Sequence, residues 1–288
     1  MVDINLEEYL ETLNEEFKQK HIEHKQRPFE FFSRYSIAIN KPINLSSDFA
    51  KYIFEWFKKR AKDGAHNIGS LYTSAYYYDA QFWELSIPIF FGTVELNSLE
   101  SLKEMSDSDK EKILKNDKQK LDYIACWSNC LDYAMGFSEL VQKTDIDSFG
   151  RSLLLSANEE LRSATNNLLS LPVQKRAILN CRTAVENSLK AYLALKRGLT
   201  EKEAKNFSHN LSKLLDETIK IAGNENLNSL RGRFNKLPNI ESRYKEQTLT
   251  FLELWNGYVL AQCVNSFVVR DFTGHNILSQ MLKNDSSR

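Results

Sequence analysis

Two residues near the C-terminus of this chain could together transfer a proton beside a bound anion. His275 follows Arg270 by five positions. A histidine takes up or releases a proton near neutral pH, and an arginine is a permanent cation. Together the two side chains could move a proton beside a bound anion and hold that anion with a fixed positive charge. The pair therefore predicts a candidate catalytic site, with His275 as acid or base and Arg270 as the cation.

A second set of residues predicts a ligand-binding site. Glu186 and Lys190 are four positions apart, so on a helix they would lie on one face and could pair. His209 precedes an expected helix start, where it could satisfy backbone groups or take part in chemistry. Arg243 and Tyr244 could hold a phosphate-bearing ligand, or could anchor a helix by packing. All five are candidate ligand-binding residues, each with a structural alternative.

The four cysteines predict no metal site. Cys126 and Cys130 would share one face of a helix, but no second Cys/His pair completes a zinc site, and Cys181 and Cys263 lie in apolar helical contexts. The chain has no P-loop, no G-x-G-x-x-G, no H-E-x-x-H and no nucleophile elbow. We therefore expect neither a metal nor a cofactor.

Length and charge indicate two domains of opposite charge. A chain of 288 residues is long enough for two modest cores. Residues 1–150 hold 18 Lys/Arg against 25 Asp/Glu, a balance of −7, whereas residues 151–288 hold 20 against 13, a balance of +7. The two halves could dock on each other, or the basic half could bind an anion such as nucleic acid. The polar N-terminus and the lack of a long apolar run predict a cytoplasmic protein with no membrane contact.

The first half reads as mainly helical with one extended excursion. Apolar residues at helical spacing predict helices over 4–26, before Pro28, and over 46–64. Alternating residues between 70 and 97 predict a short β-hairpin, near 82–96, with Pro88 at an edge or a bend. A long helix is expected over 117–143. The polar stretch 144–148 predicts a domain boundary, giving domains 1–145 and 146–288.

The second half reads as four long helices. They are expected over 149–170, over 173–197 with Gly198 as its stop, from 210 onward, and over 241–270. Short connections between long helices favour an antiparallel bundle. The predicted fold class is mainly all-α, with a C-terminal four- or five-helix bundle and an N-terminal helical region that carries the β excursion.

The string of residues in this half resembles the HEPN domain family over about 120 residues. The resemblance is carried by Leu155–Leu161 with Ala164, Ala177-Ile178, the pattern A-x-E-x-x-L-K-A from Ala184 to Ala191, H-x-L-x-x-L-L from His209 to Leu215, and Arg243-Tyr244. It implies a helical bundle, frequently a homodimer, in proteins that handle nucleotides or RNA, many of them in prokaryotic toxin and defence systems. HEPN ribonucleases carry Arg-x(4–6)-His near the end of the bundle, often with a polar residue after the Arg. Arg270, Asp271 and His275 match that motif, and two facing copies would complete one site. The resemblance implies metal-independent RNA cleavage, in which His275 would move the proton of the 2′-OH or of the leaving oxygen and Arg270 would stabilise the reacting phosphate. It would also place Glu186 and Lys190 along the cleft of the bundle.

Composition alone weakens the motif, and two hypotheses follow. Chance would give roughly 0.7 such matches in this chain, and Arg60 with His66 is another. Gly274 could be no more than a helix C-cap, with Arg270 a favourable C-terminal charge.

The favoured hypothesis is a nucleotide- or RNA-related binding or interaction protein whose acidic, aromatic N-terminal half meets a protein partner. The alternative is a metal-independent ribonuclease that uses Arg270 and His275.

Overall fold

The structure is a computed structural model, and it describes residues 5–45, 47–62, 70–89, 96–239, 241 and 247–280. The chain divides into two compact units, Met1–Gly69 and Ser70–Arg288, which are considered separately below. The secondary structure is mainly α-helical, with one two-stranded sheet among the described residues. The predicted fold class is confirmed.

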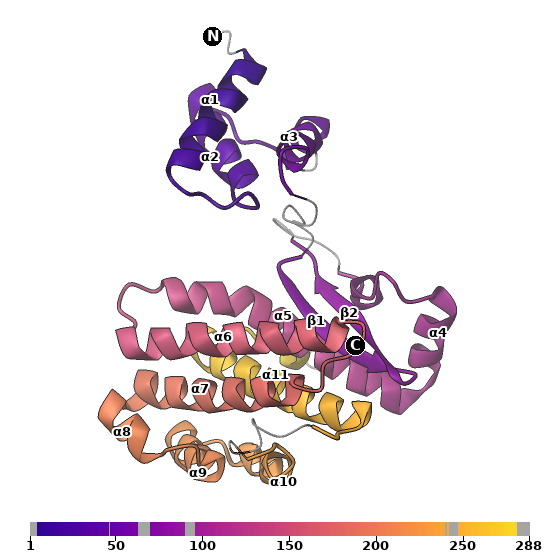
Figure 1. Cartoon of the computed structure of the whole chain (residues 1–288), viewed down its shortest axis with the longest axis vertical. Helices are drawn as coiled ribbons and strands as arrows, with labels where there is room; N and C mark the ends of the chain where they lie inside the picture. Colours follow the sequence, from indigo (N-terminus) through magenta and orange to yellow (C-terminus); the bar gives the residue numbers. More distant parts are fainter. Residues whose placement is uncertain are drawn as a thin grey trace. The chain divides into compact units, whose positions relative to one another are not determined.

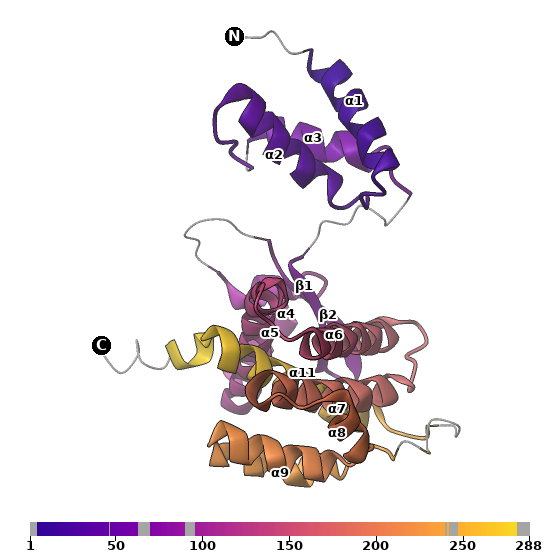
Figure 2. The same ribbon diagram turned by 90° about the vertical axis from the view of Figure 1, so that its left-hand side faces the viewer.

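The first unit consists of three helices around an aromatic core. These are α1 (Leu6–Gln19), α2 (Arg27–Ile39) and α3 (Asp48–Lys58) (Figure 2). The expected helix over 4–26 ends earlier, at Gln19, and Pro28 begins α2 because proline is tolerated in the first turn of a helix, where its missing amide has no intrahelical partner. The expected helix over 46–64 is also shorter, since α3 ends at Lys58 and the described residues 59–62 are not helical. The buried core residues of this unit are Leu10, Leu13, Phe17, Phe31, Phe32, Ala50, Ile53, Trp56 and Phe57.

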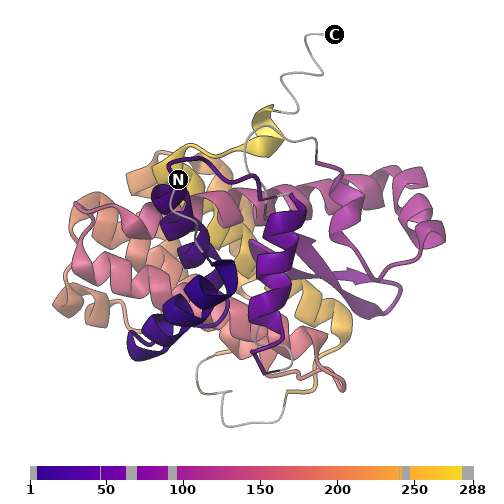
Figure 3. The ribbon, with the colours of Figure 1, turned by 90° about the horizontal axis from the view of Figure 1, so that it is seen from above.

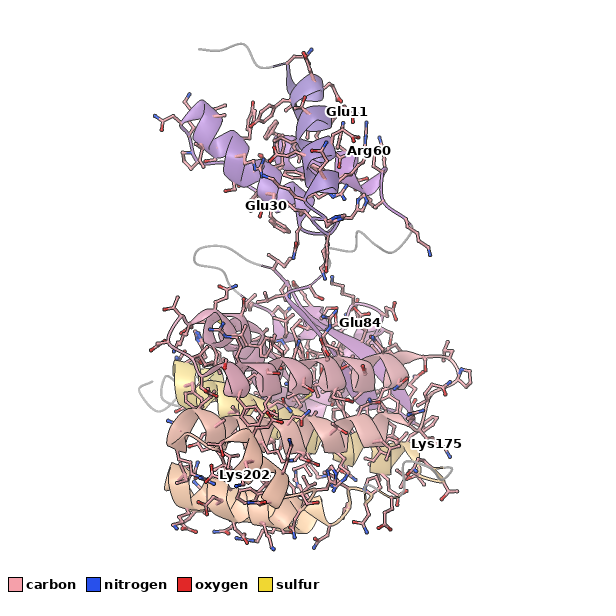
Figure 4. All side chains as sticks on the ribbon, turned by 60° about the vertical axis from the view of Figure 1, so that its left-hand side comes forward. Glu11, Glu30, Arg60, Glu84, Lys175 and Lys202 are labelled. Atoms are coloured by element: carbon pink, nitrogen blue, oxygen red, sulfur yellow. The ribbon has the colours of Figure 1, made fainter. Side chains whose placement is uncertain are left out.

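A stacked cation links α1 to the end of α3. The Arg60 guanidinium lies 3.5 Å from the centroid of the Trp56 ring and donates a hydrogen bond of 2.7 Å to Glu11 (Figure 4). The Trp56 indole donates to Glu7, 2.9 Å away. These contacts satisfy the Arg60 guanidinium within its own unit. His66, the second residue of this motif match, lies outside the described residues.

The β-hairpin lies in the second unit and is shifted toward the N-terminus of the predicted one. Strands β1 (Tyr72–Tyr78) and β2 (Gln81–Ile87) pair antiparallel, with Tyr76 opposite Trp83. The turn residues Asp79 and Ala80 have φ of 51° and 59°, a pattern typical of tight hairpin turns that follow the twist of the strands. The predicted alternation at 83–87 is β2, but its partner precedes it. Pro88 follows β2 directly, since proline has no amide for the ladder. The predicted excursion continues to residue 96, but residues 90–95 lie outside the described residues and Leu96 is not in a strand.

Helices make up the rest of the second unit. They are α4 (Asp107–Lys115), α5 (Asp117–Gln142), α6 (Ser148–Leu169), α7 (Ala177–Arg197), α8 (Glu201–Asn206), α9 (Leu211–Ala222), α10 (Arg231–Phe234) and α11 (Phe251–Thr273), with 3-10 turns at Ser98–Ser101 and Glu225–Leu230. Helix α7 packs against α6, α11 and α9, and α5 packs against the other side of α11 (Figure 1). The hairpin lies beside α5 and α6 (Figure 3).

The helix boundaries differ from the predicted ones at one main point. Helix α11 begins at Phe251 rather than near 241, because Thr250 and Glu253 form a capping box there, and it continues three residues past the predicted end to Thr273. Helices α5, α6 and α7 match the predicted ranges to within a few residues. Local caps fix these ends, whereas apolar periodicity alone sets them only loosely.

The predicted domain boundary near residue 145 falls inside the second compact unit. The reason is that the hairpin and α5 share the core of the bundle. Tyr72 donates a hydrogen bond of 2.7 Å to Gln262 of α11, and the Tyr258 hydroxyl lies 2.8 Å from the Ser74 hydroxyl and accepts from the Ala75 amide. The polar stretch 144–148 is therefore the loop between α5 and α6, and the division lies at Gly69/Ser70.

Candidate functional site

Arg270, near the end of α11, is held by side chains of α5. Its Nη1 donates to Asn129 Oδ1 at 2.8 Å and to Asp132 Oδ2 at 3.0 Å. Asp132 is fully buried, and its other oxygen accepts from the Ile277 amide at 2.9 Å. Burial raises the pKa of Asp132, while the Ile277 amide and Arg270 act in the opposite direction. Arg270 thus balances a buried carboxylate and ties α5 to the segment after α11.

His275 also lies against α5, two residues after α11 ends at Thr273. Gly274 caps the helix with φ 77°, as the sequence suggested, and turns the chain so that His275 Nε2 lies 2.9 Å from Glu139 Oε2. The imidazole is 28% exposed. Gly136 of α5 makes room for it, because a Cβ at that position would come within 3.2 Å of His275 Cδ2.

The two motif residues lie along one face of α5 but bind different partners. Asp132 and Glu139 are seven residues apart, which is about 10 Å along a helix. Asp271, the polar residue after Arg270, accepts from Lys196 at 2.7 Å and from the Tyr192 hydroxyl at 3.1 Å. The structure therefore leaves His275 partly open to solvent while the charge of Arg270 is balanced by Asp132 and that of Asp271 by Lys196.

Three of the five predicted ligand-binding residues meet at the turn between α8 and α9. Glu186 and Lys190 of α7 pair at 2.7 Å, and the Glu186 side chain is only 7% exposed. His209 Nδ1 lies 3.0 Å from both carboxylate oxygens of Glu186, while its side chain remains 49% exposed. Lys190 donates to the carbonyl of Ser208, whose φ of 50° is uncommon for a residue other than glycine. Glu186, Lys190 and His209 thus form one cluster that fixes the turn.

Sequence reasoning missed a fourth member of this cluster, Arg182. It precedes Glu186 by four residues on the same face of α7 and donates to the His209 carbonyl at 2.7 Å. Only 6% of the residue is exposed, and its Nε has no hydrogen-bond partner among the described residues. Burial lowers the pKa of Arg182, and the neighbouring Glu186 opposes that shift. The four-residue spacing of Arg182, Glu186 and Lys190, which places all three on one face of α7, was the available signal.

A cleft opens beside this cluster, and we call it the α9 cleft. Its volume is about 640 Å³. Residues of α7, α8, α9 and α10, with the segments next to them, line it. The described lining residues are Arg182, residues 206–213, Phe234, Asn235, Leu237, Asn239 and Glu241. The cleft therefore combines four apolar side chains with asparagine amides, two cationic side chains and His209.

Two predicted binding residues cannot be placed. Arg243 and Tyr244 lie outside the described residues.

Among the residues that are described, no cluster of His, Cys, Asp and Glu could hold a metal ion. Cys126, Cys130 and Cys181 are buried free thiols, and Cys263 is a half-buried one. In the described ranges, no helix combines the length and the apolar character needed to cross a membrane.

Comparison with known proteins adds no relative to these observations. No family model matches the chain, and searches of curated proteins and of solved structures find no match. The functional interpretation therefore rests on the residues and their geometry.

Proposed function

We propose that this chain is a binding protein for a nucleotide or a segment of RNA, and that the ligand enters the α9 cleft. The observation that carries the proposal is the composition of that cleft. A cavity of about 640 Å³ lies within the usual size range for small-ligand sites, roughly 300–1,000 Å³. The predicted residue His209 lines it, and Glu186 and Lys190 hold His209 in place.

The lining supplies the groups that recognise an unpaired base. Phe207 lines the cleft with its ring packed partly on the core of the unit, and the part of an aromatic ring that stays exposed can stack on a base. Asn206, Asn210, Asn235 and Asn239 bring amide donors and acceptors that suit base edges. Lys213 adds an exposed cation for the backbone of the ligand. Together these groups favour a nucleotide or single-stranded RNA over an apolar ligand.

The proposal is tested by measuring binding of adenosine, guanosine, cytidine and uridine monophosphates and of a short single-stranded RNA. Phe207→Ala should weaken binding about tenfold, because a base stacked on an aromatic ring contributes about 1–3 kcal/mol. Phe29→Ala, which also removes a half-buried phenyl ring but in the first unit, is the matched control. A folded protein that binds none of these ligands, or equal losses in the two variants, would overturn the proposal.

A metal-independent ribonuclease is the second candidate, and the position of His275 favours it. The imidazole is partly exposed and lies with Arg270 along the same face of α5. The pairing of Arg270 with buried Asp132 speaks against it, because that carboxylate already offsets the positive charge that a reacting phosphate would need. We rank it below binding for that reason.

The ribonuclease candidate is tested with a mixed single-stranded RNA pool in EDTA. Wild-type protein should cut the pool, and His275→Ala should lose that activity while keeping its fold. His24→Ala changes a histidine of the first unit and serves as the control. The absence of cleavage by wild-type protein would remove this candidate and leave the binding proposal unaffected.

Two partner proposals accompany the function. Facing copies of Arg270 and His275 require a homodimer, so the molar mass in solution, measured by light scattering, should be twice the 33.4 kDa of one chain. The acidic, aromatic first half is proposed to meet a protein partner. A monomer at all concentrations would remove the composite catalytic site.

A further inference from the structure

The start of α9 presents two amides to the α9 cleft that bind no acceptor among the described residues. Asn210 is the N-cap, and its side chain accepts from the Lys213 amide at 3.0 Å. The first amides of a helix have no intrahelical acceptor, and within the described part of the chain those of Leu211 and Ser212 have no other acceptor either. Both residues line the cleft. The positive end of a twelve-residue helix therefore meets this space.

Arg182 is an independent sign that the cleft receives an anion. The residue is 94% buried, since 6% of it is exposed, and it lines the cleft. It donates one hydrogen bond to the His209 carbonyl, and its Nε finds no acceptor among the described residues. A buried guanidinium with unused donors is unfavourable unless an anion completes its hydrogen bonds. The nearest carboxylate, Glu186, is already shared by Lys190 and His209.

The charges around the cleft agree with that sign. Arg182 and Lys213 are its cationic side chains, and Glu241, which is exposed, is the one carboxylate among its described lining residues. Helix amides, a guanidinium and an ammonium group form the combination that binds phosphate oxygens. The neutral asparagines occupy the remaining rim.

We propose that the first turn of α9 binds the phosphate group of the ligand, through the Leu211 and Ser212 amides and the Arg182 guanidinium. The inference rests on the proposed function for the class of ligand, because a nucleotide would place its phosphate there and its base toward Phe207. A terminal phosphate, with two charges near neutral pH, is favoured over an internal diester, which carries one. The site is distinct from that of Arg270 and His275, whose side chains contact α5.

The test compares three probes: inorganic phosphate, adenosine 5′-monophosphate and adenosine. The wild-type chain should bind the monophosphate at least about tenfold more tightly than adenosine, and inorganic phosphate should compete with it. Ser212→Asp places a negative charge in the first turn of α9, where it favours the helix but repels a phosphate. It should weaken binding of the monophosphate about tenfold or more. Ser148→Asp, in the first turn of α6, is the matched control and should bind as the wild type does.

The outcomes separate this inference from the proposed function. Equal affinity for adenosine and its monophosphate, or equal behaviour of Ser212→Asp and Ser148→Asp, overturns the phosphate site while nucleotide binding stands. Binding of inorganic phosphate that Ser212→Asp abolishes, without binding of any nucleotide or RNA, supports the phosphate site and overturns the proposed function. If none of the three probes binds to the folded chain, the phosphate site is overturned, and the proposed function fails as well only when the other monophosphates and the RNA also do not bind.

Discussion

At the scale of single residues, the partners of Arg270 explain more than its place in a motif does. Asp132 is fully buried and uses one oxygen for Arg270 and the other for the Ile277 amide. A buried carboxylate is costly unless charges and donors compensate it, and these two contacts do so. Arg270 is therefore needed to keep α11 and the following segment on α5, whatever else it does.

We expect Asp132→Asn to lower the free energy of unfolding by about 3 kcal/mol, because it leaves Arg270 without its counter-charge in a mostly buried setting. Urea denaturation measures the change. Asp271→Asn, which breaks a half-exposed pair with Lys196, should cost less than about 1 kcal/mol. Similar losses in the two variants would show that the Asp132 pair has no special structural weight.

The first unit should weaken in acid because of Glu16. Hydrogen bonds from Arg34 and Lys20 lower the pKa of Glu16 to about 2, from an ordinary value of 4.5. A carboxyl group with a lowered native pKa contributes stability above the unfolded pKa and loses it as pH falls. That contribution should therefore disappear between about pH 4.5 and pH 2.

The acid effect can be followed at the Trp56 indole proton, since the other three tryptophans lie in the second unit. Glu16→Gln should flatten the pH dependence of the first unit over this window. Glu15→Gln removes a neighbouring exposed carboxylate and is the control. An unchanged profile in Glu16→Gln would contradict the role given to Glu16.

At the scale of elements, the contact between α5 and α11 depends on one glycine. A Cβ on Gly136 would lie 2.4 Å from Val269 Cγ1 and 2.7 Å from Thr273 Oγ1. Val269 is buried and β-branched, so its side chain has little freedom to move. The helices can approach closely enough to bring Arg270 to Asp132 only because residue 136 has no side chain.

Gly136→Ala should destabilise the second unit by about 1–3 kcal/mol, the usual cost of overpacking. Gly232→Ala, in α10, has no atom within 4 Å of the added carbon and should stabilise by about 0.5–1 kcal/mol through helix propensity. Thermal unfolding monitored by circular dichroism compares the two. If Gly136→Ala proved the more stable of the two variants, α5 and α11 would be able to move apart without a loss of stability.

At the scale of the whole molecule, two separate cores define the organisation. Aromatic residues of α1, α2 and α3 form one core, and the hairpin with α5 to α11 forms the other. Each unit thus has its own buried apolar surface, which is the main source of its stability. The predicted boundary near residue 145 would instead cut through the second core.

Fragments test this organisation directly. Residues 1–69 and residues 70–288, expressed separately, should each unfold in one cooperative transition. Residues 146–288 should not, because removal of α5 exposes buried residues of α11 and leaves the Ser266 hydroxyl without its acceptor, the Asn129 carbonyl. A stable, cooperative 146–288 fragment would restore the boundary near 145.

The sequence by itself determined the helical class, the long helices and several of their ends, and the placement of Glu186 and Lys190 on one helix face. These features depend on residues within a few positions of one another, so apolar periodicity, caps and four-residue spacing report them. The sequence also pointed to α5 as a helix and to the end of α11 at Gly274.

Only the tertiary structure decided which helices share a core, and thereby the partners of the candidate residues. Asp132 meets Arg270 across 138 residues, and His209 meets Glu186 across 23, through packing that no local pattern encodes. The hairpin register and the place of Arg182 beside the α9 cleft were decided in the same way. Electrostatic partners depend on distance in space, and the fold alone brings distant residues within hydrogen-bonding range.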